Sequence, residues 1–134
     1  MHLTVEAKIA NIEQVISFVN DRLDEMSCTK RAKTQIDIAL DELFSNICHY
    51  AYDGEVGLAT VRVVEVPDDN SVRITLEDSG IPFNPLQHDD PDVTLSLSER
   101  SIGGLGIFMV KKTMNDVQYE YKDGLNMLTV VKTL

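Results

Sequence analysis

ALDELFSNICHYAY, residues 39–52, is the stretch that decides the fold, because its apolar residues repeat with a helical period. An α-helix turns by about 100° per residue, so these apolar side chains and one just before them fall on a single face. They are Ile36, Ala39, Leu40, Leu43, Phe44 and Ile47. Thr29 is placed to cap the helix, which we predict to run to about Tyr50.

Glu42 and Asn46 stand four residues apart at the edge of this apolar face. A carboxylate one turn from an amide can position a water or hydroxyl nucleophile, and the amide oxygen can coordinate a cation. Mg²⁺ takes few protein ligands and fills its shell with phosphate oxygens and water, so one Asn suffices. Taken alone, such a pair is more often simply solvated, and the neighbouring His49 is interpreted as a surface residue.

DSGIPFNP, residues 78–85, follows a segment rich in β-branched residues. This places Asp78 at the end of a strand, with Gly80 permitting a sharp turn. A carboxylate held there can accept a hydrogen bond from the exocyclic amine of adenine and so select adenine over guanine. Without other motifs, an ordinary Asp-Ser-Gly turn is the more common interpretation.

GGLG, which comprises Gly103, Gly104, Leu105 and Gly106, opens a second helical pattern. Small residues let phosphates approach the exposed N–H groups of a helix start, where the helix dipole favours negative charge. The spacing matches neither a P-loop nor a Rossmann fingerprint, which excludes those two sites. A helix start without a ligand is equally common for this motif alone. In this order, the three motifs together predict one site for ATP and Mg²⁺.

The remaining patterns predict an α+β fold in which helices cover one face of a largely antiparallel sheet. Alternation predicts a strand at Leu3–Lys8. Helical spacing predicts a helix after it, with Asn11 as the N-cap and Gln14 three residues later in a capping box. The predicted hairpins are Leu58–Pro67 with Ser71–Glu77, and Val117–Tyr121 with Leu125–Leu134 across Asp123-Gly124. A helix is predicted over Gly103–Met114, and a long mobile loop over the polar segment Leu86–Ile102.

Composition narrows the function classes. The length of 134 residues with 43% hydrophobic residues predicts a single globular domain over residues 1–134. No apolar stretch approaches the roughly 18 to 20 residues of a membrane span, so we expect a cytoplasmic protein. In that compartment we expect Cys28 and Cys48 to be free thiols. The net charge of −10 opposes direct binding to nucleic acid or to anionic membranes and favours a protein partner.

ALDELFSNICHYAY, DSGIPFNP and ERSIGGLGIFMVKK together resemble the anti-sigma-factor serine/threonine kinases of the GHKL superfamily of ATPases, over nearly the whole chain. The resemblance implies a Bergerat-type two-layer α/β sandwich whose mixed, mostly antiparallel sheet carries helices on one face. It also implies ATP and Mg²⁺ as cofactors, a homodimer, and two protein partners: a sigma factor and a STAS-type anti-anti-sigma protein.

The same resemblance implies a role for individual residues. Glu42 would be the catalytic carboxylate, Asn46 the Mg²⁺ ligand, and Asp78 with Gly80 the adenine reader. In the GGLG motif, which also contains Gly103 and Leu105, Gly104 and Gly106 would bind phosphate. Arg100 would be a lid arginine that contacts the phosphate or the protein substrate. Thr129 would supply a hydroxyl that supports the adenine contact. The chain departs from the family where Tyr50 takes the place of a common histidine.

Two functions are compatible with these residues. The first is a kinase that phosphorylates a serine or threonine of the STAS-type protein and alternately sequesters the sigma factor. The second is an ATP-sensing module that switches partners without transferring phosphate. Glu42 favours the first, because a pure binding module has no need of a base.

Overall fold

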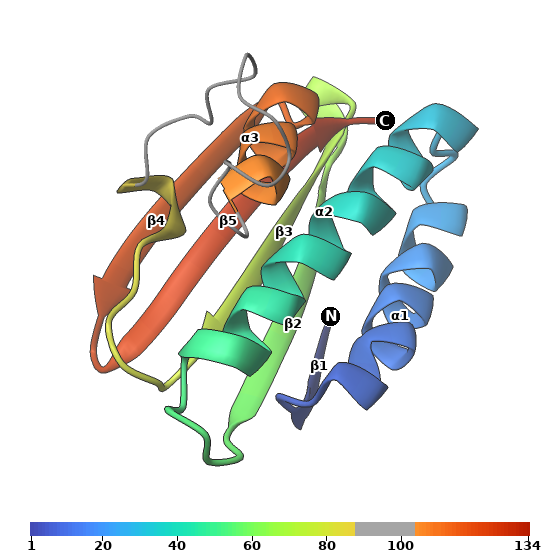
Figure 1. Ribbon diagram of the computed structural model, residues 1–134. Coiled ribbons are helices and arrows are strands. Elements are labelled where there is room, and N and C mark those ends of the chain that lie inside the picture. The colour runs from blue at the N-terminus through green and yellow to red at the C-terminus, as the bar shows by residue number, and fades with distance from the viewer. Residues whose placement is uncertain (88–103) are drawn as a thin grey trace.

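A five-stranded sheet forms one layer of the molecule, as the computed structural model shows over the residues that it describes, 1–87 and 104–134 (Figure 1). Its order is β1-β2-β3-β5-β4, and every neighbouring pair is antiparallel. The strands are β1 (His2–Glu6), β2 (Leu58–Val66), β3 (Ser71–Asp78), β4 (Asp116–Lys122) and β5 (Leu125–Thr133). The helices are α1 (Ile12–Asp24), α2 (Lys30–Tyr50) and α3 (Gly104–Thr113).

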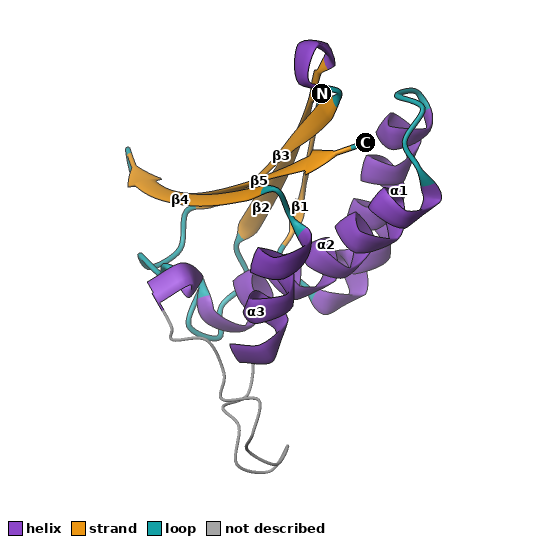
Figure 2. Ribbon diagram, turned by 90° about the horizontal axis from the view of Figure 1, so that it is seen from above, coloured by secondary structure: helices purple, strands orange, loops and turns teal. Residues whose placement is uncertain are grey.

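The helices α1, α2 and α3 all lie on one side of the sheet (Figure 2). The predicted α+β sandwich with helices on one face is therefore confirmed. β1, predicted near Leu3–Lys8, is an edge strand of the sheet, and β4 forms the other edge.

The core lies between these two layers. Alternate residues of β3 point into it, so Val72, Ile74 and Leu76 are buried while Arg73 is exposed. The apolar face of α2 predicted from residues 36–47 is buried against them, with Phe44 only 1% exposed. Burial of each such side chain stabilises the fold by about 1.5–3 kcal/mol, which holds α2 firmly on the sheet.

The helices α1 and α2 begin where predicted, but different hydrogen bonds are made at their first residues. The Thr29 hydroxyl accepts a hydrogen bond from Ala32 N at 3.2 Å and caps α2 as expected. Asn11 occupies the N-cap position of α1 but makes no side-chain cap. Its amide donates instead to the Glu6 carbonyl at 2.9 Å. The expected capping box with Gln14 is therefore wrong, because the end of β1 offers a nearby acceptor.

Tight turns set the register of the sheet. Asp123 (φ 54°) and Gly124 (φ 79°) both adopt left-handed conformations, as the two central residues of a type I′ hairpin require. The turn fixes β4 against β5, and β5 pairs with β3 so that Asn126 lies opposite Asp78. Residues far apart in the sequence thus meet at one end of the sheet.

Several sequence expectations concern features beyond the sheet. Cys28 and Cys48 are free thiols, as predicted. None of the helices within residues 1–87 and 104–134 has both the length and the apolar character needed to cross a membrane. The predicted mobile loop Leu86–Ile102 falls mostly outside the described residues; its first two residues belong to a short 3₁₀ turn at Pro85–Gln87.

Candidate functional site

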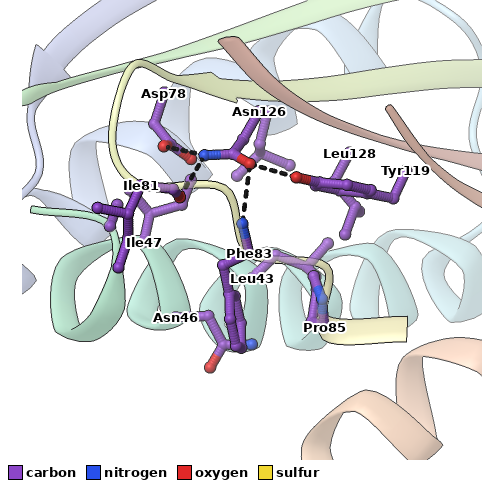
Figure 3. Close-up of a pocket in the computed structure, with 12 residues that line it drawn as sticks. Leu43, Asn46, Ile47, Asp78, Ile81, Phe83, Pro85, Tyr119, Asn126 and Leu128 are labelled. Atoms are coloured by element: carbon purple, nitrogen blue, oxygen red, sulfur yellow. Dashed lines mark hydrogen bonds between the residues drawn. The ribbon is translucent and has the colours of Figure 1, made fainter. Parts of the chain in front are cut away.

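A pocket opens between the C-terminal half of α2 and the ends of β3, β4 and β5 (Figure 3). The cavity that a water-sized sphere can enter has a volume of about 40 Å³, and it lies within about 430 Å³ of space that includes open solvent. Its apolar walls are formed by Leu43, Ile47, Leu76, Ile81, Phe83 and Leu128.

Asp78, the last residue of β3, provides the carboxylate of this pocket. It is only 7% exposed, and its Oδ1 accepts hydrogen bonds from Gly80 N and Asn126 Nδ2, both at 2.9 Å. Within the part of the chain that the structure describes, Oδ2 accepts no hydrogen bond. Burial raises the pKa of Asp78, while the hydrogen bonds from Asn126 and Gly80 lower it. The free oxygen can therefore accept a donor from a ligand.

Asn126 of β5 stands beside Asp78 and was not predicted from the sequence. Its Nδ2 also donates to the Ile81 carbonyl at 2.9 Å, and its Oδ1 accepts from Phe83 N at 3.1 Å. The Tyr119 hydroxyl donates to the same oxygen. Asn126 thus joins β4, β5 and the segment after β3 in one polar network (Figure 3). The available sequence signal was a polar residue at an inward position of a strand.

Gly80 brings the Asp78 turn into contact with α2. A Cβ at Gly80 would lie 2.1 Å from the carbonyl oxygen of Ala51, the residue that follows α2. Ile81 N donates to the same carbonyl at 2.8 Å. Gly80 is therefore needed for close approach of two backbones, and this contact ties Asp78 to the helix that carries Glu42 and Asn46.

Glu42 lies on α2 against the first turn of α3. A Cβ at Gly106 would lie 2.1 Å from Glu42 Cδ, so the carboxyl group occupies the space that this glycine leaves. Its Oε1 is buried and has no hydrogen-bond partner among the described residues. Burial raises the pKa of Glu42, and Asp41 raises it further, while His49 lowers it. An unpaired carboxyl group with a raised pKa is suited to accept a proton.

Asn46 lines the same pocket, one turn after Glu42. Figure 3 shows its amide on the opposite side of the pocket from the Asp78–Asn126 pair. No group of three or more His, Cys, Asp or Glu side chains that could hold a metal occurs in residues 1–87 and 104–134. A cation bound beside Asn46 would thus take most of its ligands from phosphate and water.

Not every predicted site residue joins the pocket. Thr129 lies on the opposite face of the sheet, where its hydroxyl is hydrogen-bonded to the Thr75 hydroxyl at 2.9 Å. The structure therefore contradicts the expected support of adenine by Thr129, since its neighbours Leu128 and Asn126 face the pocket instead. Arg100 and Gly103 lie outside the described residues. Gly104 and Leu105 begin α3, and Gly106 follows them against Glu42.

Comparison with known proteins assigns the chain to a family. Residues 5–132 match the histidine kinase-like ATPase domain. The chain belongs to this family. The resemblance seen in the three motifs is thereby confirmed at the level of the ATPase family, and the domain spans nearly the whole sequence.

Curated relatives of this domain are named as protein kinases. The chain is 23% identical over 128 residues to the serine-protein kinase RsbW of Bacillus thuringiensis (strain Al Hakam), covering 92% of this chain and 72% of the relative. It is 25% identical over 100 residues to the serine/threonine-protein kinase BtrW of Bordetella bronchiseptica (strain ATCC BAA-588), covering 75% of this chain and 70% of the relative.

Solved structures show the same fold. The histidine kinase domain of a blue-light activated histidine kinase from Erythrobacter litoralis matches with a TM-score of 0.56 and 12% identity over 94% of this chain. This chain spans only 60% of that domain's length. The histidine kinase AdeS of Acinetobacter baumannii matches with a TM-score of 0.53 and 16% identity, over 99% of this chain and 67% of that structure. Both likenesses support the predicted ATPase sandwich.

Proposed function

We propose that the chain binds ATP with Mg²⁺, phosphorylates a serine or threonine of a STAS-type anti-anti-sigma protein, and sequesters a sigma factor. The observation that supports this most strongly is the buried Asp78, which lines an apolar pocket and has one oxygen without a hydrogen bond among the described residues, in a domain of the histidine kinase-like ATPase family. The relatives named as serine-protein kinases favour phosphoryl transfer to a hydroxyl.

The adenine ring would occupy the pocket. Oδ2 of Asp78 would accept its 6-amino group, and the apolar walls around Ile47 and Leu128 would contact its faces. Gly80 would act indirectly, by keeping the Asp78 turn close to α2.

The triphosphate would extend from the pocket toward the start of α3. Gly103, Gly104, Leu105 and Gly106 would offer backbone N–H groups to it, and Arg100 would contact the γ-phosphate or the protein substrate. The Asn46 amide oxygen would hold Mg²⁺, which would neutralise phosphate charge. Asn46 lines the pocket, and the described residues hold no cluster of three or more His, Cys, Asp or Glu side chains that could bind a metal, which fits a cation held mainly by phosphate and water.

Glu42 would be the catalytic base. Its carboxylate would take the proton from the substrate hydroxyl as that oxygen attacks the γ-phosphorus. The bond between the γ-phosphorus and the oxygen that bridges the β- and γ-phosphates would break, and ADP would leave with the electron pair of that bond. The raised pKa of Glu42 makes it a stronger base than an exposed glutamate.

The proposed partners and assembly rest on the charge of the chain and on its resemblance to the anti-sigma-factor kinases. A net charge of −10 favours a basic protein surface and opposes direct nucleic-acid or membrane binding. The homodimer remains a prediction, for which the edge strand β1 offers one possible pairing surface. A cytoplasmic location likewise remains a prediction.

Transfer of labelled γ-phosphate from ATP to STAS proteins of the same organism tests the proposal. We expect one such protein to be labelled on a serine or threonine. The Glu42→Gln variant serves as the matched control, because it should bind ATP normally and transfer no phosphate. ATP binding and ATP-dependent partner exchange without labelling would instead support the alternative, a partner-switching module without kinase activity.

A further inference from the structure

The orientation of the Asn126 amide follows from its neighbours. The backbone N–H of Phe83 can only donate, so the atom that it meets at 3.1 Å is the oxygen of Asn126. The Ile81 carbonyl can only accept, so the atom at 2.9 Å from it is the Asn126 nitrogen. Asn126 therefore donates to Asp78 and cannot accept from it.

This fixed donor determines how Asp78 is used. Asp78 Oδ1 accepts two N–H groups, from Asn126 and from Gly80, each at 2.9 Å. Both bonds favour the ionised carboxylate, and they leave Oδ2 as its remaining acceptor. The Tyr119 hydroxyl also donates to the Asn126 oxygen and so helps to hold the amide in place.

We infer that Asn126 is a positioning residue that keeps Asp78 an ionised hydrogen-bond acceptor and thereby makes the pocket select 6-amino purines over 6-oxo purines. Adenine presents an amino donor at position 6, whereas guanine presents an oxygen acceptor there. An ionised Asp78 repels the guanine oxygen, but a protonated Asp78 could donate a hydrogen bond to it. The selectivity therefore depends on Asp78 remaining ionised. This inference rests on the proposed nucleotide function.

Few other groups influence the charge of Asp78. Among the described residues, the titratable neighbours are the phenols of Tyr119, which is electrostatically coupled to Asp78, and of Tyr52, which accepts from Ser79 N at 3.0 Å. The residues paired with Asp78 in the sheet, Ala59 of β2 and Asn126 of β5, are uncharged. The residues of α2 that line the pocket are also uncharged: Leu43, Asn46 and Ile47. Loss of the Asn126 donor would accordingly raise the pKa of Asp78 further.

Calorimetric titration with ATP and GTP between about pH 5.5 and 8 tests the selectivity. A hydrogen bond to a charged group accounts for roughly a 10- to 100-fold change in affinity. We expect Asn126→Leu, which has similar size but no donor, to lose about that much ATP affinity at the acidic end and less at the alkaline end. Its preference for ATP over GTP should narrow in parallel. Asn126→Thr restores a donor and should recover part of both properties, and Tyr119→Phe should give a weaker effect of the same sign.

A measurement without nucleotide tests the positioning role separately. Carbon NMR of the Asp78 carboxyl group, assigned by its loss in Asp78→Asn, reports the titration midpoint in the free protein. The midpoint should rise in Asn126→Leu and should not change in Thr129→Val, which alters the same strand on its opposite face. A midpoint that Asn126→Leu and Asn126→Thr leave unchanged, or an unaltered preference for ATP over GTP, overturns the inference. A folded wild-type protein that binds no ATP would refute the proposed function instead.

Discussion

Gly80 and Gly106 each stand where two parts of the site touch with no room for a side chain. They differ in what an added Cβ would meet. At Gly80 it would meet the backbone of Ala51, which is held in place by α2, whereas at Gly106 it would meet the movable end of Glu42. The same substitution should therefore have different consequences at the two positions.

Gly80→Ala should destabilise the protein by about 2–3 kcal/mol and weaken ATP binding, because the turn that carries Asp78 must move away from α2. Denaturant unfolding and ATP titration measure the two effects. Gly124→Ala is the matched control: its hairpin has open space but a φ of 79°, so it should cost about 1 kcal/mol and leave ATP binding intact. Equal ATP affinities for both variants would contradict the role of Gly80.

Gly106→Ala should leave stability nearly unchanged, because the gain in helix propensity of about 1 kcal/mol offsets the crowding at Glu42. The displaced carboxyl group should nevertheless slow phosphoryl transfer by about 100-fold, the usual cost of misplacing a reacting group by roughly 1 Å. Single-turnover transfer at saturating ATP measures this rate. Full activity in the variant would show that the position of Glu42 seen here is not required.

Glu42 should make the fold less stable as pH rises. Its folded-state pKa is raised, mainly by burial, above the unfolded value of about 4.3. Protonated Glu42 therefore makes its full contribution to the free energy of unfolding below a pH of about 4, and this contribution is lost as pH rises through the folded-state pKa. Urea unfolding should find Glu42→Gln more stable than the parent at neutral pH and equal to it in acid. A difference between the two proteins that stays constant with pH would exclude this mechanism.

At the scale of elements, α2 organises the site. Its buried face packs on the sheet, its edge carries Glu42 and Asn46, and its C-terminal end receives the Asp78 turn through Ala51. Its contact with α3 places Glu42 against Gly106. The positions of Glu42, Asn46 and the Asp78 turn thus depend on how firmly this helix is formed.

Thr29→Ala should destabilise the protein by about 1 kcal/mol, because it removes the side-chain cap of α2. Asn11→Ala is the natural comparison. Asn11 stands at the N-cap of α1 without capping it, and its exposed hydrogen bond to Glu6 should contribute less. Thermal unfolding of both variants measures the difference; a larger loss for Asn11→Ala would contradict the observed caps.

At the scale of the whole molecule, the pocket exists only in the folded chain. Its lining residues come from α2, β3, β4, β5 and the segments that follow α2 and β3, and they range from Leu43 to Leu128 in the sequence. A ligand that occupies this pocket binds the native state and not the unfolded one. Stability should consequently depend on ligand concentration.

Mg-ATP at about 100 times its dissociation constant should stabilise the protein by about 2.7 kcal/mol and raise the melting temperature by several degrees. Differential scanning fluorimetry across an ATP series measures the shift. GTP serves as the control and should produce a smaller shift, because Asp78 cannot accept from its 6-oxo group. Identical shifts with ATP and GTP would contradict adenine recognition by Asp78.

Local patterns in the sequence were sufficient to predict most of the fold. The helical repeat over residues 36–47 predicted α2 and its buried face, and the Asp123-Gly124 pair predicted the last hairpin. Asp78 was correctly placed at a strand end next to a close turn. Each of these features depends on residues within a few positions of each other, where periodicity, capping and turn geometry act directly.

Only the tertiary structure decided which residue stands beside Asp78. The sequence resemblance favoured Thr129, but the register of β5 against β3 turns Asn126 toward the pocket and Thr129 to the opposite face. Side chains alternate along a strand, so an assignment wrong by an odd number of residues exchanges the two faces of the sheet. That register is set by pairing between strands 48 positions apart, and no local pattern in either strand specifies it.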